Sequence, residues 1–262
     1  MVLSVALCAA EKEGPGRKEI PSVYPGGVVN AAGFVPAPDN FVAPLSIISI
    51  FGEDLALRTA QVGALNGQGR LPDRLGGVQV TIGGLTIPLF FVSPRQINAQ
   101  VPRALAPRER PWTMRIVREG LVGPDAEVSV RAVAPGLFPV VVHRDFTVVG
   151  RAPLLPSTPA RPGDLVILFG TGFGPTVPTA DTGELPPGPA AIVMPSSVWI
   201  EDRMISPDRV LYIGQTPGLA GLQQVNVLLP EDLAAGDPQV FVEVAGRRTQ
   251  SGVRVAVDRP DP

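Results

Sequence analysis

Short apolar runs alternate along this chain with clusters of glycine, proline and polar residues. Val78, Val80 and Ile82 are separated by polar residues, which is the two-residue period of a strand with one buried face. Residues 45–51 are apolar at almost every position, as in a strand that is buried on both faces. We find no stretch of eleven residues with the period of an amphipathic helix. The pattern therefore predicts an all-β fold of short strands.

Turn residues divide these runs into two sets of predicted strands. Gly83-Gly84 is typical of a tight hairpin. The first set of predicted strands covers 45–51, 78–82, 87–92, 96–101, 112–117 and 126–133. The second set covers 165–169, 197–201, 210–213, 223–229, 239–244 and 254–257. Many short strands separated by turns are typical of an immunoglobulin-like β-sandwich.

One phrase occurs twice in the chain. Residues 96–102 read Gln-Ile-Asn-Ala-Gln-Val-Pro, and residues 224–230 read Gln-Val-Asn-Val-Leu-Leu-Pro, an offset of 128 residues (224 − 96). An apolar segment precedes each copy, at 44–52 and at 162–170. Self-similarity of this kind indicates a repeated structural unit.

We therefore predict two tandem immunoglobulin-like β-sandwich domains, over 28–134 and 160–258. Residues 1–27 are predicted to be a flexible lead-in, 135–159 an interdomain connector and 259–262 a tail. Four prolines between 153 and 162 favour an extended connection. Ile48 and Ile167 are predicted at core positions of the two sandwiches.

Composition excludes several classes of protein. The net charge of the 262-residue chain is −2, which argues against a nucleic-acid partner. Only two of the 22 basic residues are lysines, Lys12 and Lys18. Cys8 is the only cysteine, so an internal disulfide and a cysteine-based zinc site are both impossible.

The first ten residues are apolar and end in small residues, like the end of a signal-peptide hydrophobic region. No basic stretch precedes them, so we interpret them as a signal-peptide remnant with a truncated or misassigned start. No run approaches the ~20 apolar residues of a membrane span. We predict an extracellular or cell-surface protein without a transmembrane span.

Catalytic and metal-binding patterns are missing from the sequence. His143 is the only histidine, and no G-x-S-x-G motif accompanies it. The glycines of 170–175 are followed by proline rather than by a helix or a Lys-Ser/Thr pair, which argues against a phosphate-binding loop. Asp164, Asp181 and Glu184 do not form a calcium-loop pattern. We predict no catalytic residue, no metal, no cofactor and no enzymatic activity.

Several segments together resemble one known family. They are VNAAGF (29–34), APLSIISIFG (43–52), LGGVQV (75–80), PLFFVSPRQIN (88–98), APGLF (134–138), ARPGD (160–164), TGFGP (171–175) and PGLAGLQQVN (217–226). Their order resembles the uncharacterised Solibacter C-terminal domain family of Acidobacteria, which is related to the IPT/TIG type of immunoglobulin-like domain. The resemblance runs from about residue 28 to 257. It implies a module of exported proteins and supplies no catalytic residue. This chain differs in that the module stands almost alone, with about 27 residues ahead of it.

The repeated phrase also supplies the candidate site. Strand alternation places Gln96, Asn98 and Gln100 on one face, and Gln224 with Asn226 on one face of the second copy. Asparagine is disfavoured inside strands, so its recurrence needs a cause. These amides either satisfy backbone groups of adjoining loops, or form an interdomain face, or bind a glycan or peptide.

The sequence favours a non-catalytic exported interaction, adhesion or scaffold module whose partner is a protein or glycan at the cell surface. The alternative is a carbohydrate-binding module, in which Trp112 and Trp199 could stack on sugars. A hydrolase with an unrecognised site is the third interpretation.

Overall fold

The computed structural model describes residues 19–151 and 156–258, and within them almost all regular structure is β-strand. Residues 1–18, with the predicted signal remnant and Cys8, and the predicted tail 259–262 lie outside the described residues. The strands of the first half are β1 (Ser22–Asn30), β2 (Ile47–Glu53), β3 (Ala60–Gln61), β4 (Val78–Ile82), β5 (Leu85–Thr86), β6 (Leu89–Val92), β7 (Gln96–Gln100), β8 (Trp112–Arg118), β9 (Leu121–Val122) and β10 (Ala126–Val128).

The second half has a similar set of elements. Its strands are β11 (Gly136–His143), β12 (Val148–Val149), β13 (Ser157–Thr158), β14 (Leu165–Thr171), β15 (Thr176–Val177), β16 (Ala190–Ile192), β17 (Ser196–Ile200), β18 (Arg203–Met204), β19 (Val210–Gln215), β20 (Gln223–Leu228), β21 (Val240–Val244) and β22 (Arg247–Arg248). A single 3₁₀ turn, η1 (Pro207–Arg209), precedes β19.

Each half packs two sheets around its own core. In the first half the sheet β1-β2-β7-β6-β3 faces the sheet β10-β8-β4-β5. Ile48, Ile50, Val80, Ile97 and Ile116 lie between these sheets and are at most 1% exposed. In the second half the sheet that contains β11, β14, β20 and β19 faces β18-β17-β21-β22. The predicted all-β, immunoglobulin-like sandwich architecture is confirmed.

The two copies of the repeated phrase occupy equivalent places. β7 pairs with β2 so that Asn98 lies opposite Ser49, and β20 pairs with β14 so that Asn226 lies opposite Ile167. The strand on the other side of each copy has an irregularity at the same point, between residues 89 and 91 in β6 and between 210 and 212 in β19. The internal repeat is therefore a repeat of strand register as well as of sequence.

Three features differ from the sequence-based expectations. The segment predicted as a connector, 135–159, contributes β11, β12 and β13 to the large second sheet, because β11 pairs along β14. β1 begins at Ser22, inside the predicted lead-in. Ile167 lies on the outer face of its sheet and is 6% exposed, whereas its neighbours Val166 and Leu168 are fully buried in the core.

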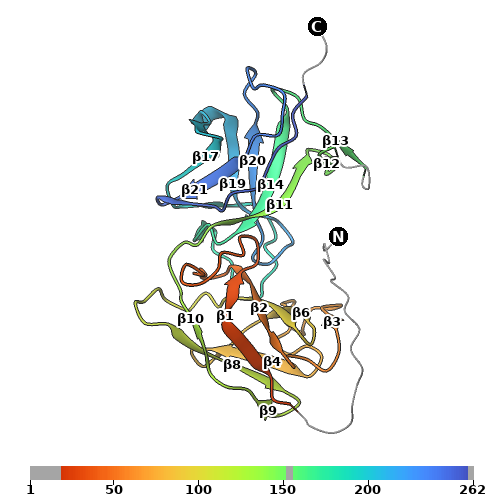
Figure 1. Ribbon diagram of the computed structural model, residues 1–262, viewed down its shortest axis with the longest axis vertical. Coiled ribbons are helices and arrows are strands. Elements are labelled where there is room, and N and C mark those ends of the chain that lie inside the picture. Colours follow the sequence, from red (N-terminus) through yellow and green to blue (C-terminus); the bar gives the residue numbers. More distant parts are fainter. Residues whose placement is uncertain (1–18, 152–155, 259–262) are drawn as a thin grey trace.

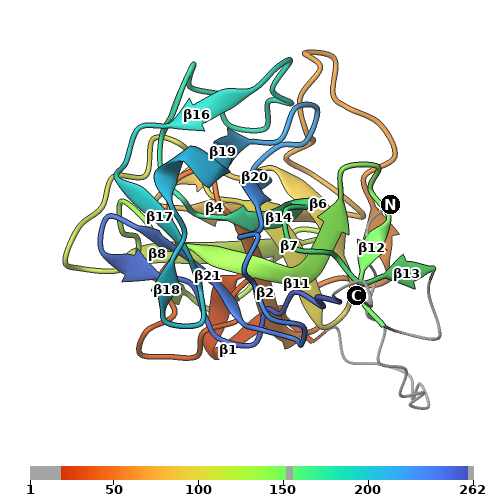
Figure 2. The same cartoon turned by 90° about the horizontal axis from the view of Figure 1, so that it is seen from above.

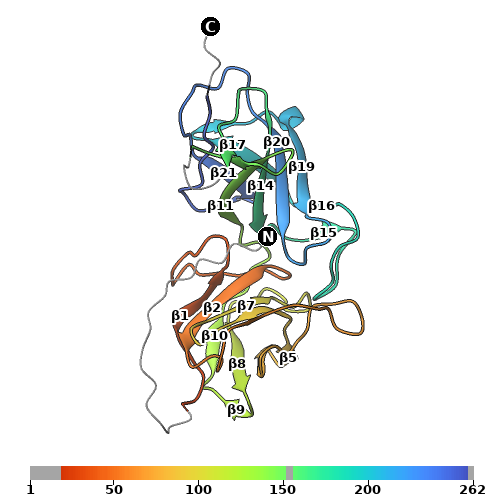
Figure 3. The ribbon, with the colours of Figure 1, turned by 90° about the vertical axis from the view of Figure 1, so that its right-hand side faces the viewer.

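The two sandwiches are stacked end to end along the long axis (Figures 1 and 3). Seen along that axis, they largely overlap (Figure 2). At the end remote from the second sandwich, the buried Arg118 guanidinium donates hydrogen bonds to the carbonyls of Glu19 and Asp54. At the opposite end, Arg151 pairs with Asp237 and Asp258. The first and last described residues therefore lie at opposite ends of the molecule.

Candidate functional site

The junction between the sandwiches contains the largest concentration of buried polar side chains with long-range partners. Asn30, at the end of β1, is 4% exposed. Its Nδ2 donates to the carbonyls of Ala134 at 2.7 Å and Thr171 at 3.3 Å. Its Oδ1 accepts from the backbone amides of Ala32 and Gly33. The Asn30 side chain thus joins the end of β1 to the segment before β11 and to the last residue of β14, which lie at the same end of that antiparallel pair.

Thr171 makes a second connection at the end of β14. Its hydroxyl is fully buried. It accepts a hydrogen bond from the Ile47 amide at 2.9 Å and donates one to the Gly221 carbonyl at 2.7 Å. Because Ile47 begins β2, this single side chain links the central sheets of both sandwiches.

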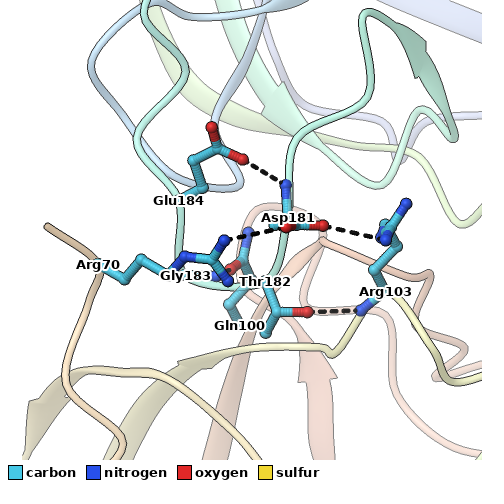
Figure 4. A network of polar contacts seen from close by, with 7 residues as sticks. All are labelled: Arg70, Gln100, Arg103, Asp181, Thr182, Gly183 and Glu184. Atoms are coloured by element: carbon cyan, nitrogen blue, oxygen red, sulfur yellow. Dashed lines mark hydrogen bonds and ion pairs between the residues drawn. The ribbon is translucent and has the colours of Figure 1, made fainter. Parts of the chain in front are cut away.

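A loop of the second sandwich, residues 181–184, lies against the first sandwich (Figure 4). The Gly183 amide donates to Oε1 of Gln100 at 2.7 Å, and Gln100 Nε2 donates to the Leu45 carbonyl at 3.2 Å. The Gly183 carbonyl in turn accepts from the Leu71 amide. Gln100 is 1% exposed, so this predicted site residue is part of the junction.

Ion pairs surround this loop. Asp181 lies between two arginines of the first sandwich, 2.9 Å from Arg70 and 3.0 Å from Arg103 (Figure 4). The Arg103 backbone amide also donates to the Thr182 hydroxyl at 3.0 Å. The three charged side chains are 39–54% exposed, so water and salt screen these pairs and the buried amides dominate the energetics.

Gln250 completes the junction from the last part of the chain. Its Oε1 accepts from the Leu137 amide, and its Nε2 donates to the carbonyls of Leu137 and Ala32. We call Asn30, Gln100, Thr171, Gln250 and the 181–184 loop together the joint. Its hydrogen bonds join residues up to 218 positions apart in sequence, so the joint connects the two sandwiches at several separate points.

The other four predicted amides do not take part in the joint. Gln96 Nε2 donates to Asn98 Oδ1 at 2.8 Å, and Ser49 Oγ donates to the same oxygen at 3.0 Å. In the second sandwich Gln224 Nε2 donates to Asn226 Oδ1 at 3.0 Å. All four are partly exposed on the outer faces of their sheets. The repeated phrase thus contains residues of two kinds, one in the joint and four that face outward.

The two tryptophans are poorly placed for stacking on a sugar. The Arg108 guanidinium lies 3.4 Å from the Trp112 ring centre, and the ring also packs closely over Gly83. Trp112 Nε1 donates to the Ala106 carbonyl at 3.1 Å. Arg248 lies 4.5 Å from the Trp199 ring centre. Cation–π packing of this kind explains both rings as structural elements.

Two open surface hollows contain titratable groups. One surrounds His143, whose Nε2 lies 3.0 Å from the Thr158 carbonyl, with Asp145 and Asp164 nearby. A hydrogen bond from the Thr147 hydroxyl lowers the pKa of Asp145. The other contains Arg115, whose hydrogen bond lowers the pKa of Asp125. In the first hollow the Thr158 hydroxyl also lies 3.2 Å from His143 Nε2.

Two further findings apply to residues 19–151 and 156–258. Within these ranges we find no group of three or more histidine, cysteine, aspartate or glutamate side chains that could hold a metal ion. They also contain no helix long and apolar enough to cross a membrane.

No protein-family model and no curated protein match the chain. Solved structures align with it only distantly. SGBP-B of the Bacteroides ovatus mixed-linkage glucan utilization locus, solved with a mixed-linkage heptasaccharide, is 10% identical with a TM-score of 0.33, over 94% of this chain and 49% of that one. Domains 5–6 of the S-layer protein SbsC are 10% identical with a TM-score of 0.27, over 92% and 100%.

The Z1Z2 domains of titin, solved with telethonin, are 14% identical with a TM-score of 0.23, over 94% of this chain and 100% of theirs. The chain spans about half the length of SGBP-B. Alignments with TM-scores this low give no information about a functional site or an activity of this chain.

Proposed function

We propose that this chain is a non-catalytic, exported module that holds two β-sandwiches in a fixed arrangement as a scaffold or adhesive spacer. The observation that carries the proposal is the joint. Asn30, Gln100 and Thr171 are at most 4% exposed, and each forms hydrogen bonds to backbone groups of the other sandwich. Separating the sandwiches would break these hydrogen bonds, each of which contributes a net stabilisation of about 0.5–1.5 kcal/mol.

The shape of the molecule supports the same proposal. Interfaces between domains normally permit relative motion unless they are extensive, and here side-chain bonds cross the junction at several separate points. The described residues begin at one end of the stack and finish at the other (Figure 1). A fixed end-to-end stack suits a protein that separates or presents other surfaces.

Small-angle X-ray scattering tests the fixed arrangement. We expect one maximum dimension, unchanged between ~0.1 and ~1 M salt. At 1 M the Debye length is only about 3 Å, which weakens the exposed Asp181 pairs but leaves the buried amides in place. A scattering curve that requires a broad distribution of sandwich orientations would refute the scaffold proposal.

Export is tested separately on intact cells of the source organism. Added protease should remove the protein while a cytoplasmic marker survives. Full protection of the chain until the cells are lysed would refute export.

A further inference from the structure

An aromatic and amide cluster covers the outer face of the first sandwich. In the register of the central sheet, Phe51 of β2 lies opposite Gln96 of β7, and Phe91 of β6 lies opposite Asn98. All four side chains are partly exposed. The exposed Phe34 adds a ring 6.2 Å from Phe51. We call Phe51, Phe91, Gln96 and Asn98 the first quartet.

The second sandwich repeats this arrangement position by position. Phe169 of β14 lies opposite Gln224 of β20, and Tyr212 of β19 lies opposite Asn226. These four, the second quartet, are again partly exposed and face away from the core. The two quartets share their residue classes, their register and the hydrogen bond from glutamine to asparagine.

The amides of the first quartet present a fixed donor and a fixed acceptor. Gln96 Nε2 and Asn98 Oδ1 are bonded to each other. Among the described residues nothing bonds to Asn98 Nδ2 or Gln96 Oε1, and neither atom is buried. Neighbouring sugar hydroxyls both donate and accept, so one can accept from Asn98 Nδ2 while the next donates to Gln96 Oε1.

The rings supply the other half of sugar recognition. The C–H face of a pyranose is apolar, and an exposed phenylalanine offers it a flat surface with little loss of side-chain entropy on binding. No side chain of either quartet carries a charge. A neutral glycan fits this combination better than an anionic one, which needs arginine or lysine.

We propose that the first quartet binds a neutral glycan, with sugar rings against Phe51 and Phe91 and hydroxyls bonded to Gln96 and Asn98. This inference goes beyond the proposed scaffold function, because it assigns a ligand class to a surface of the first sandwich. The second quartet is a weaker subsite, because the Tyr212 hydroxyl is already bonded to backbone groups of Ala190 and Gln215.

Affinity electrophoresis of the full chain in gels that contain neutral polysaccharides tests the proposal. The panel is starch, xylan, galactomannan and β-glucan, with alginate and heparin as anionic polymers. We expect saturable retardation in at least one neutral polymer. Retardation in none of the neutral polymers, or only in the anionic ones, would overturn the proposal.

A charge-matched pair of variants then locates the site. Asn98→Asp keeps the shape of the side chain and replaces the free donor by an acceptor, so we expect at least fivefold weaker binding. Gln79→Glu adds the same charge on β4, in the opposite sheet of the same sandwich, where the outward-facing side chain is also partly exposed. Binding should be unchanged in that control, and circular dichroism should show both variants folded. The proposal would be refuted if wild type and Asn98→Asp bound the polysaccharide equally well, or if Asn98→Asp and Gln79→Glu lost the same amount of binding affinity.

The outcome is independent of the scaffold test. If the protein binds no glycan, the scattering result on the arrangement of the sandwiches still stands. If scattering shows a flexible junction, the first quartet can still bind a glycan, because all four of its residues belong to the first sandwich.

Discussion

Replacing Thr171 by valine is the sharpest test of the joint. Valine has nearly the same shape, so Thr171→Val creates no cavity but removes the hydroxyl that bonds to Ile47 and Gly221. The side chain is fully buried, and each buried group left unpaired costs about 1–3 kcal/mol. The Ile47 bond is only partly buried, so we expect a loss of about 2–4 kcal/mol in the free energy of unfolding.

Urea unfolding followed by tryptophan fluorescence and circular dichroism measures this loss. Thr113→Val is the matched control, because Thr113 is an exposed residue of β8 and such substitutions usually change stability by less than about 0.5 kcal/mol. The separation between the sandwiches, measured by scattering, should also become less uniform in Thr171→Val. An unfolding free energy within about 0.5 kcal/mol of wild type, with unchanged scattering, would refute the role assigned to this hydroxyl.

Four further predictions concern the two cores, an ion pair, a tight turn and the ionisation of Tyr212. Ile48→Asp and Val166→Asp should each abolish cooperative melting of their own sandwich, because an unpaired charge would enter a fully buried site; a normal calorimetric transition in either variant would contradict the strand register. Arg103→Ala should lower the free energy of unfolding, measured by denaturant titration at low salt, by less than about 1 kcal/mol. A larger decrease would show that the ion pairs of Asp181 stabilise the junction more than its buried amide hydrogen bonds do. Gly83→Ala should lower the melting temperature, because the residue has a φ of +59° and lies against the Trp112 ring; unchanged melting would argue against that packing. Burial raises the pKa of the Tyr212 hydroxyl above its ordinary value of 10.0, so the free energy of unfolding of the wild type should fall as the pH rises past 10. Tyr212→Phe has no hydroxyl to ionise there, so its free energy of unfolding should fall less over the same pH range. Identical curves of unfolding free energy against pH for the two proteins would contradict the raised pKa.

Sequence patterns predicted the sheets because their signals are local. Alternation along 78–82 and the glycine turn at 83–84 correspond to β4 and its hairpin with β5. The repeated phrase identified two strands whose partners match in register. The all-β class and the outward position of Gln96 and Asn98 follow from the same two-residue period.

Other features needed the structure because their signals are not local. Val166, Ile167 and Leu168 are all apolar, so alternation could not tell which of them faces the core, and Ile167 was assigned to the wrong face. The joint was missed for a related reason. Asn30 and Thr171 are single polar residues whose partners are backbone groups 104 to 141 residues away, and backbone groups leave no mark in a sequence. Gln100 was identified only because it shares its strand with the repeated phrase.

The joint also determines where the molecule can be divided. A fragment that ends at Val133 would remove both carbonyls that Asn30 Nδ2 binds, and it would expose Gln100 once the 181–184 loop was gone. The complementary fragment would leave the Thr171 hydroxyl without the Ile47 amide. We therefore expect the smallest piece that folds with all these hydrogen bonds in place to be the pair of sandwiches.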